Sequence, residues 1–278
     1  MTQIDKSRFE WIGSDSARRE GISRPSTTFW KDAIGRLMKN KVAVVCFFII
    51  VLLILSCIIV PFFSPFESRE QHLGEVNKGF MTVCTDSRYE GQHHVHYFGT
   101  DNLGRDLFLR AFEGGRVSLM IAFAAVFVNL IVGLIYGGIS GYLGGTVDMI
   151  MMRIVDIIST IPLTLYVILI MQVLGAGIQS IIVALGSVYW VDMARVVRGQ
   201  ILSLKQQEFV LAAKTIGSSA TTILFDHLIP NALGSILVTI TMLIPSAIFM
   251  EAFLGYLGIG LQPPLASLGT MCNDASAN

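Results

Sequence analysis

The sequence predicts an all-α membrane protein, a polytopic bundle of helices that crosses the lipid bilayer several times. Hydrophobic residues make up 53% of the 278 residues and charged residues only 14%, whereas soluble domains carry about 25% charged residues. Several uncharged apolar runs reach about 20 residues, the length needed to cross a hydrocarbon core about 30 Å thick. The formal net charge is zero, so electrostatics favours no nucleic-acid partner.

Five apolar runs are predicted to cross the membrane. They follow a polar tail, residues 1–41, that contains an amphipathic segment at 29–41. The predicted spans are residues 42–63, 117–142, 157–174, 178–197 and 232–254. Residues 149–156 are expected to extend the helix of the third span, and residues 255–278 are too rich in Gly and Pro for another span.

Three residues within these spans are candidates for a transport pathway or a gate. Pro162 and Pro245 each remove one backbone hydrogen bond and are expected to kink the third and fifth spans. Kinked helices can line a gated path, although many prolines only shape a bundle. Glu251 lies deep in the fifth span, and ionisable groups are costly in lipid unless they serve a function.

Glycines recur at intervals of four in the second span, at Gly133, Gly137 and Gly141. Such spacing lets two helix backbones approach closely in a membrane. We favour packing within this chain over pairing with a second subunit.

The distribution of basic residues predicts the orientation. Residues 1–41 hold nine Lys or Arg against five Asp or Glu, and residues 67–116 hold six against eight. Cytoplasmic segments are enriched in Lys and Arg, so the N-terminus and residues 198–231 are predicted inside the cell. The loop 64–116 and the segment 255–278 are then outside, and residues 117–254 form the membrane core of a multi-pass plasma-membrane protein.

The cytoplasmic segment 198–231 is predicted to form two short helices, 206–216 and 220–229. Gly217 is expected to end the first, Ser218 or Ser219 to cap the second, and Pro230 to end it. Each helix has an apolar stripe at spacings of three and four. The two stripes are Phe209, Ala212, Ala213 and Ile216, and Ile223, Leu224, His227 and Leu228. The stripes either dock a partner protein or pack under the chain's own bundle, and physical reasoning alone leaves both open.

Several motifs in this chain resemble one family of transport proteins. Ala212-Ala213-x-x-x-Gly217, followed by His227-Leu228-x-Pro230-Asn231, is similar to the cytoplasmic loop of permease subunits in binding-protein-dependent ABC importers. "HYFGTDNLGRD", "GGRVSLMIAF", "SGYLGG", "DMIMMRIVDI" and "EAFLGYLGIGLQPPLASLG" resemble the dipeptide, oligopeptide and nickel branch. "YFGTD", "VDMARVVRGQ" and "FWKD" bring the chain nearest to the C-type oligopeptide permeases.

Two features depart from the family pattern. The family usually has Glu directly before the Ala-Ala pair, where this chain has Leu211, while Glu208 has a family counterpart. The family also continues into a sixth span, so we expect one more span beyond the five of this sequence.

The resemblance implies a subunit that moves oligopeptides through the membrane. Its partners would be a second permease subunit, two cytoplasmic ATPase subunits and an extracytoplasmic peptide-binding protein. ATP would be used by the ATPases, which would dock on the segment holding Glu208, Ala212, Ala213, Gly217, His227, Pro230 and Asn231. No GxxxxGK[ST] phosphate loop occurs, so no cofactor and no catalytic residue are predicted here.

Other functions remain alternatives at this point. Dipeptide, nickel and glutathione importers share the motifs. A secondary transporter would be expected to show charges or broken helices near the middle of the membrane, whereas the charges here cluster at span ends.

The outer loop carries a further family signature, made of Gly99, Thr100, Asp101, Gly104, Arg105 and Asp106. We favour a structural turn with local ion pairs at the entrance to the second span. Cys84, His93, His94 and His96 lie in the same loop and could hold a metal. Solvated loop histidines are the favoured interpretation, so no metal site is predicted.

Overall fold

The computed structural model describes residues 29–64, 66–85 and 95–276. The chain divides into two compact units, residues 1–53 and 54–278, and each is described by itself. The first holds α1 (Phe29–Lys39) and the beginning of α2 (Lys41–Phe63). The side chain of Asn40 accepts a hydrogen bond from the Ala43 N–H and caps α2. No described side chain of α2 is buried, as expected for a helix surrounded by lipid.

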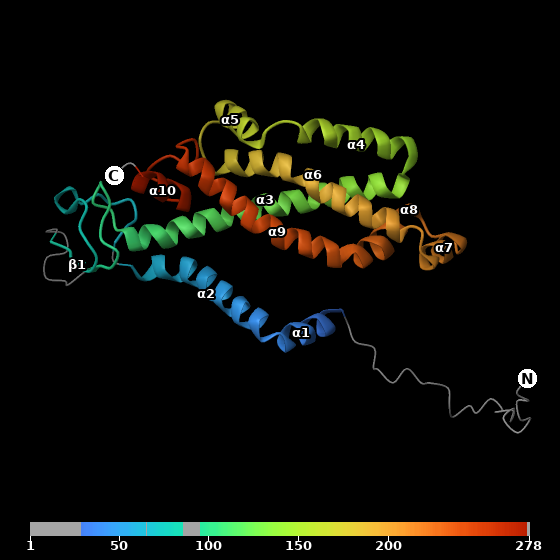
Figure 1. The fold of residues 1–278 in the computed structure, drawn as a ribbon, viewed down its shortest axis with the longest axis horizontal. Helices are drawn as coiled ribbons and strands as arrows, with labels where there is room; N and C mark the ends of the chain where they lie inside the picture. The colour runs from blue at the N-terminus through green and yellow to red at the C-terminus, as the bar shows by residue number, and fades with distance from the viewer. Residues whose placement is uncertain (1–28, 65, 86–94, 277–278) are drawn as a thin grey trace, which may run out of the picture. The chain divides into compact units, whose positions relative to one another are not determined.

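Three long helices form the centre of the second unit: α3 (Leu107–Leu143), α6 (Ile178–Leu204) and α9 (Ile229–Tyr256). α3 packs along α6 most extensively, and α9 lies against both (Figure 1). The apolar residues between them form two core clusters, one nearer each end of the helices.

Close contact between α3 and α6 depends on the glycines of α3. A Cβ placed on Gly137 would lie 2.4 Å from the carbonyl oxygen of Ala194, and one on Gly133 would lie 2.5 Å from the side chain of Met193. These glycines therefore face α6 of the same chain, as the sequence predicts.

We expect Gly137→Ala to destabilise the bundle. The added methyl group meets backbone atoms that cannot rotate away, and such overpacking costs about 1–3 kcal/mol. Thermal unfolding of the purified protein in detergent measures the effect. Gly234→Ala in α9 is the matched control, because nothing lies within 4 Å of a Cβ there. Equal unfolding temperatures for the two variants would contradict this account of the contact.

The third predicted span is not one kinked helix. It consists of α4 (Gly145–Ser159) and α5 (Leu163–Leu174), which meet at 83°. Pro162 disfavours helical backbone in the residue before it, so α4 ends at Ser159 and Pro162 stands at the start of α5. Pro245, in contrast, lies inside α9, which continues past it.

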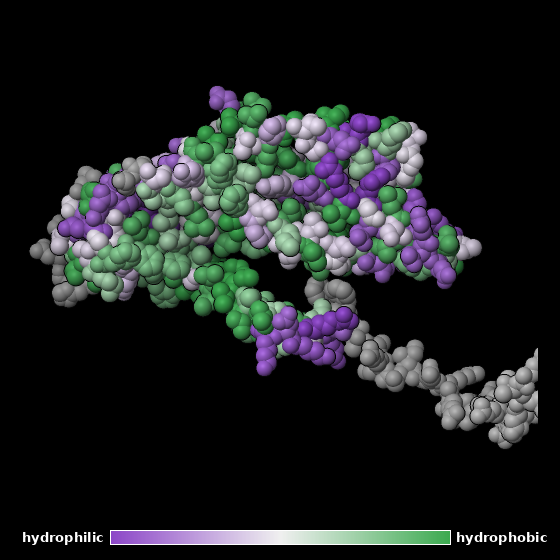
Figure 2. Space-filling view, in the orientation of Figure 1, coloured by the Kyte–Doolittle hydropathy of each residue, from purple (hydrophilic) through white to green (hydrophobic). Residues whose placement is uncertain are grey.

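Within the described residues, four helices are long and apolar enough to cross a membrane, or up to five if α4 and α5 together form one span. On the face drawn in Figure 2, hydrophobic residues cover much of the middle of the bundle and hydrophilic residues gather near α7. The protein is a multi-pass membrane protein, and its described residues form four unbroken spanning helices where five apolar runs were predicted.

α3 begins ten residues earlier than the predicted second span, so the outer loop ends at Asp106 and not at residue 116. The carboxylate of Asp106 accepts the Leu109 N–H at 2.7 Å and caps the helix. The charged residues that follow do not interrupt it, because Arg110 and Glu113 each have a polar partner from a distant segment.

The described residues of the predicted outer segment, 66–85 and 95–106, contain a 3-10 turn and a small hairpin. The turn is η3 (Leu73–Glu75), and the hairpin pairs β1 (Thr82–Val83) antiparallel with β2 (Val95–His96). After α9, the chain folds back into α10 (Leu268–Ser276), which packs on α9 and α3.

The segment between α6 and α9 holds α7 (Glu208–Thr215), α8 (Ala220–Thr222) and a π-helical turn, η5 (Ile223–Leu228). The prediction that Pro230 ends a helix is wrong: Ala220–Tyr256 is one continuous helix. The wide turn pairs the Ile229 N–H with the Leu224 carbonyl, five residues back. Pro230 directly follows this wide turn, and the helix continues past it although Pro230 has no N–H to donate.

Candidate functional site

α7 is a short helix with one anchored face and one exposed face. Val210 and Ala213 are buried in the core cluster shared with α3, α6 and α9. Phe209, Ala212 and Ile216 are exposed and lie at spacings of three and four. The helix is thus held rigidly and offers a small apolar surface, which we call the α7 face: Phe209, Ala212 and Ile216.

Gly217 joins α7 to the next helix through a left-handed backbone conformation, with φ of 86°. The Ser218 N–H donates to the Ala213 carbonyl at 3.1 Å, a bond that closes the end of α7. The Ser219 hydroxyl accepts the Thr222 N–H and caps the second helix. Both local predictions, the glycine stop and the serine cap, are confirmed.

The second predicted stripe packs inward. Ile223, Leu224 and Leu228 are buried in the same core cluster, while His227 is only half-buried. The His227 carbonyl accepts the side-chain amide of Asn231 at 2.6 Å. The second helix therefore packs under the chain's own bundle. α7 buries Ala213 of its predicted stripe but exposes Phe209, Ala212 and Ile216, and docking of a partner at α7 stays a prediction.

Three further contacts join α3, α4 and α6 near α7, and sequence reasoning did not find them. Asp148 at the start of α4 accepts from Arg198 of α6 at 2.6 Å and from the Ser140 hydroxyl of α3 at 2.5 Å. Lys205 donates to the Tyr142 carbonyl at 2.6 Å. Arg198 and Lys205 lie 50 and 63 positions from their partners Asp148 and Tyr142, so no local pattern indicates these two bonds.

At the opposite end of the bundle, Asp101 is the centre of a buried ion-pair network. Its Oδ1 accepts the N–H groups of Leu103 and Arg105 at 2.9 Å each, and its Oδ2 accepts Arg105 Nε at 2.7 Å and Arg110 Nη1. Both guanidinium groups also donate to Asp274 Oδ2 of α10, at 3.0 Å. We call Asp101, Arg105, Arg110 and Asp274 the outer latch, because the sequence predicts that this end of the bundle lies outside the cell.

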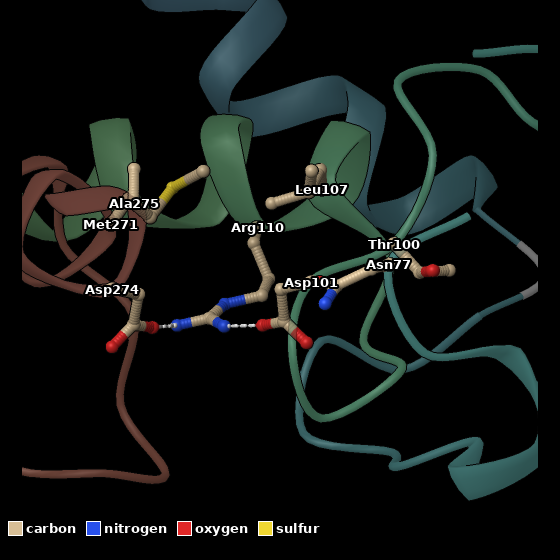
Figure 3. Close-up of a pocket in the computed structure, with 8 residues that line it drawn as sticks. All are labelled: Asn77, Thr100, Asp101, Leu107, Arg110, Met271, Asp274 and Ala275. Carbon is tan, nitrogen blue, oxygen red and sulfur yellow. Dashed lines mark hydrogen bonds and ion pairs between the residues drawn. The ribbon is translucent and has the colours of Figure 1, made fainter. Parts of the chain in front are cut away.

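Figure 3 shows Arg110 extending from α3 between Asp101 on one side and Asp274 on the other. The three residues line a small cavity together with Asn77, Thr100, Leu107, Met271 and Ala275. The latch thus joins the loop before α3 to the helix after α9. Sequence reasoning placed Asp101 and Arg105 correctly in a turn but missed Arg110 and Asp274, which are 164 positions apart.

The Asp101 carboxylate is ionised at neutral pH. Burial opposes its ionisation, but the N–H groups of Arg105 and Leu103 and the Arg110 guanidinium outweigh burial, so the pKa of Asp101 lies below its usual range. A carboxyl group whose pKa is lowered by folding adds stability above its unfolded value of about 3.9 and loses it as the pH falls further. The latch is therefore intact throughout the physiological pH range.

The rest of the outer signature holds the turn in place. The Thr100 N–H donates to the Lys78 carbonyl, and the Asp106 carboxylate contacts His96 at 2.7 Å. Gly99 and Gly104 both have positive φ, and a Cβ on Gly104 would collide with the His72 carbonyl.

The three predicted pathway or gate residues are not brought together. Glu251 is fully buried and accepts the Ser118 hydroxyl at 2.6 Å, and that hydroxyl also accepts the Leu268 N–H at 3.3 Å. Pro162 lines a cavity beside α6 with Asp192 and Arg195 among its neighbours. Pro245 is exposed on α9.

Known proteins with similar sequences are inner membrane components of transport systems. Residues 130–277 match the family of binding-protein-dependent transport system inner membrane components, and residues 28–79 match the N-terminal TM domain of oligopeptide transport permease C. The chain belongs to this family of inner membrane transport components, which are permeases and not enzymes.

Individual relatives cover nearly the whole sequence. The oligopeptide transport system permease protein OppC of Bacillus subtilis (strain 168) is 46% identical over 99% of this chain and 86% of the relative. The dipeptide transport system permease protein DppC of the same strain is 44% identical over 92% of this chain and 76% of the relative. The fold is also similar to the inward-facing MetNI methionine ABC transporter, with a TM-score of 0.50 and 20% identity over 62% of this chain and 88% of that one.

Proposed function

We propose that this chain is the C-type permease subunit of an ATP-driven importer of oligopeptides. The observation that carries the proposal is the α7 face, a small apolar surface on a helix anchored through Val210 and Ala213. A partner that moves α7 moves the bundle with it, because α7 shares a core with α3, α6 and α9. A flexible loop would absorb such motion.

The proposed partners of the α7 end are two ATPase subunits in the cytoplasm, with a second permease completing the path. ATP binds to and is hydrolysed by the ATPases, and this chain itself binds no cofactor and catalyses no reaction. The excess of basic residues at 1–41 supports a cytoplasmic N-terminus. With this orientation in the bacterial plasma membrane, α7 lies on the cytoplasmic side and the outer latch lies on the extracytoplasmic side.

The outer end is proposed to receive peptide from an extracytoplasmic binding protein. The latch keeps the loop before α3 and the helix α10 in one rigid surface, which suits repeated docking of such a protein. Glu251 joins α9 to α3 through Ser118 and is better suited to clamp the bundle than to line a path. Pro162 is the stronger gate candidate, since it stands at the break between α4 and α5 and lines a cavity.

The docking proposal is tested by co-purification of the ATPase subunits with the tagged permease complex. Ala212→Arg places a charge on the α7 face, and burying an unpaired charge in an interface costs about 2 kcal/mol or more, so recovered ATPase falls more than about tenfold. Leu211→Glu is the matched control, because Leu211 is an exposed neighbouring residue that is not part of the α7 face; this variant retains the ATPase. Full recovery with Ala212→Arg would refute docking at this face.

Dipeptides are the second candidate substrate, because the dipeptide permease relative is 44% identical against 46% for the oligopeptide one. Uptake into proteoliposomes that hold the complete complex and its binding protein distinguishes the two candidate substrates. Preferential uptake of a labelled pentapeptide over a labelled dipeptide supports the proposal, and the reverse preference replaces oligopeptides with dipeptides.

A further inference from the structure

The outer segment contains a second buried cluster of polar side chains: His72, Glu75 and Cys84. His72 directly precedes η3, Glu75 ends it, and Cys84 directly follows β1. All three are less than one-tenth exposed. Cys84 also packs with Phe66 and Leu109 in a small apolar cluster, so the three polar groups face one another in an environment with little access to water.

The geometry of these groups is close to that of a metal site. One imidazole nitrogen, one carboxylate oxygen and the Sγ of Cys84 all lie within 4.8 Å of one another. Ligands of a tetrahedral zinc ion, with bonds of about 2.0–2.3 Å, lie roughly 3.6 Å apart. The three side chains would need to close by about one ångström around the ion.

We propose that His72, Glu75 and Cys84 bind a zinc ion that stabilises the outer segment. Nitrogen, oxygen and sulfur donors together are typical of zinc, whereas calcium and magnesium take oxygen ligands. Binding displaces the proton of the Cys84 thiol to solvent, so the thiolate and the Glu75 carboxylate balance the two charges of the ion. The fourth position would be taken by water or another side chain of the segment.

A histidine beside the cluster supports this assignment. His96 Nε2 lies 3.1 Å from Glu75 Oε2, and His96 Nδ1 lies 2.7 Å from Asp106 Oδ2. The ring of His96 stacks on Phe66 with centroids 4.4 Å apart. Hydrogen bonds of this kind fix the orientation of metal ligands. Because Asp106 caps α3, the bound zinc would join η3 and the hairpin to the start of that helix.

The site differs from the metal site considered from the sequence. That site combined Cys84 with His93, His94 and His96, and the first two histidines lie outside the described residues. His96 instead holds the carboxylate of Glu75, and His72 supplies the imidazole. The competing account of the cluster is a purely hydrogen-bonded core, in which Glu75 accepts the Thr85 hydroxyl at 2.8 Å.

The test is the metal content of the full-length protein, purified in nanodiscs, incubated with zinc chloride and then passed through a chelating resin. We expect about one zinc per chain in the wild type, with Cys84→Ser and His72→Gln each lowering retention at least tenfold. Cys272→Ser, at an exposed cysteine, is the control and keeps the metal.

A second measurement needs no variant of the three proposed ligands. Wild-type protein loaded with Co²⁺ should show the intense near-ultraviolet charge-transfer band of a cobalt–thiolate bond, and Cys272→Ser should show it equally. Absence of this band, or zinc retention equal to wild type in both ligand variants, overturns the proposal. Loss of zinc in a His93→Ala, His94→Ala double variant, with retention in His72→Gln, would also overturn it and move the site to those histidines.

Discussion

Gly217→Val is expected to abolish ATP-driven uptake while the protein still inserts in the membrane at wild-type levels. Gly217 has φ of 86°, and nothing lies within 4 Å of a Cβ there, so the effect arises from the backbone and not from a clash. A β-branched residue in this conformation costs about 2 kcal/mol or more. That energy shifts the balance between conformations of the elbow by about thirty-fold or more and turns the α7 face away from its partner.

Gly217→Asn is the matched control, because asparagine tolerates the left-handed conformation. It should retain most of the uptake measured in proteoliposomes with the complete complex. Normal uptake by the valine variant, at equal protein levels, would show that the elbow does not transmit the motion of the ATPases. Equal loss in both variants would show that the position needs glycine for a reason other than its backbone angle.

Arg110→Met is expected to destabilise the outer segment by about 3–5 kcal/mol, the usual effect of removing one partner from a buried ion pair. The substitution removes one of the two guanidinium groups that join the carboxylates of Asp101 and Asp274, and only that of Arg105 remains. Hydrogen exchange of the Leu103 and Arg105 amides, both bonded to Asp101, reports the loss directly as faster exchange.

Arg116→Met provides the comparison for Arg110→Met. Arg116 lies on the same helix but is exposed, and surface substitutions usually change stability by less than about 0.5 kcal/mol. Unchanged exchange of the two amides in Arg110→Met would mean that Arg105 alone is sufficient to hold Asp101 and Asp274 together. The latch would then be redundant at Arg110.

The helices of this protein could be predicted from the sequence where one local property determines them. A charge-free run is enough to identify α2, and Gly217 and Ser219 are enough to locate the elbow. Two errors arose where a local signal was overridden. Charges at Arg110 and Glu113 suggested a loop, but their partners from other segments let α3 extend through them. Pro230 suggested a helix end, but the helix continues from the π-helical turn before it into α9, although Pro230 has no N–H to donate.

The functional ends of the bundle were only partly predictable for the same reason. The stripe of α7 was visible because its residues are close in sequence. Which members face outward depends on Val210, whose burial is determined by three other helices. The outer latch needs Asp274 next to Arg110, and the cluster of His72, Glu75 and Cys84 needs a turn and a hairpin to fold together. No spacing within the sequence encodes these distances.

The uninterrupted helix Ala220–Tyr256 has a consequence for how the two ends communicate. At a rise of 1.5 Å per residue, its 37 residues form a rod roughly 55 Å long. The rod begins at Ala220, just after the Gly217 elbow. Near its other end, Glu251 accepts a hydrogen bond from Ser118 of α3. A movement of α7 is therefore expected to tilt or shift this whole helix, which is unbroken between its two ends. The surface around α10 would then move when a partner acts on α7 at the opposite side of the membrane.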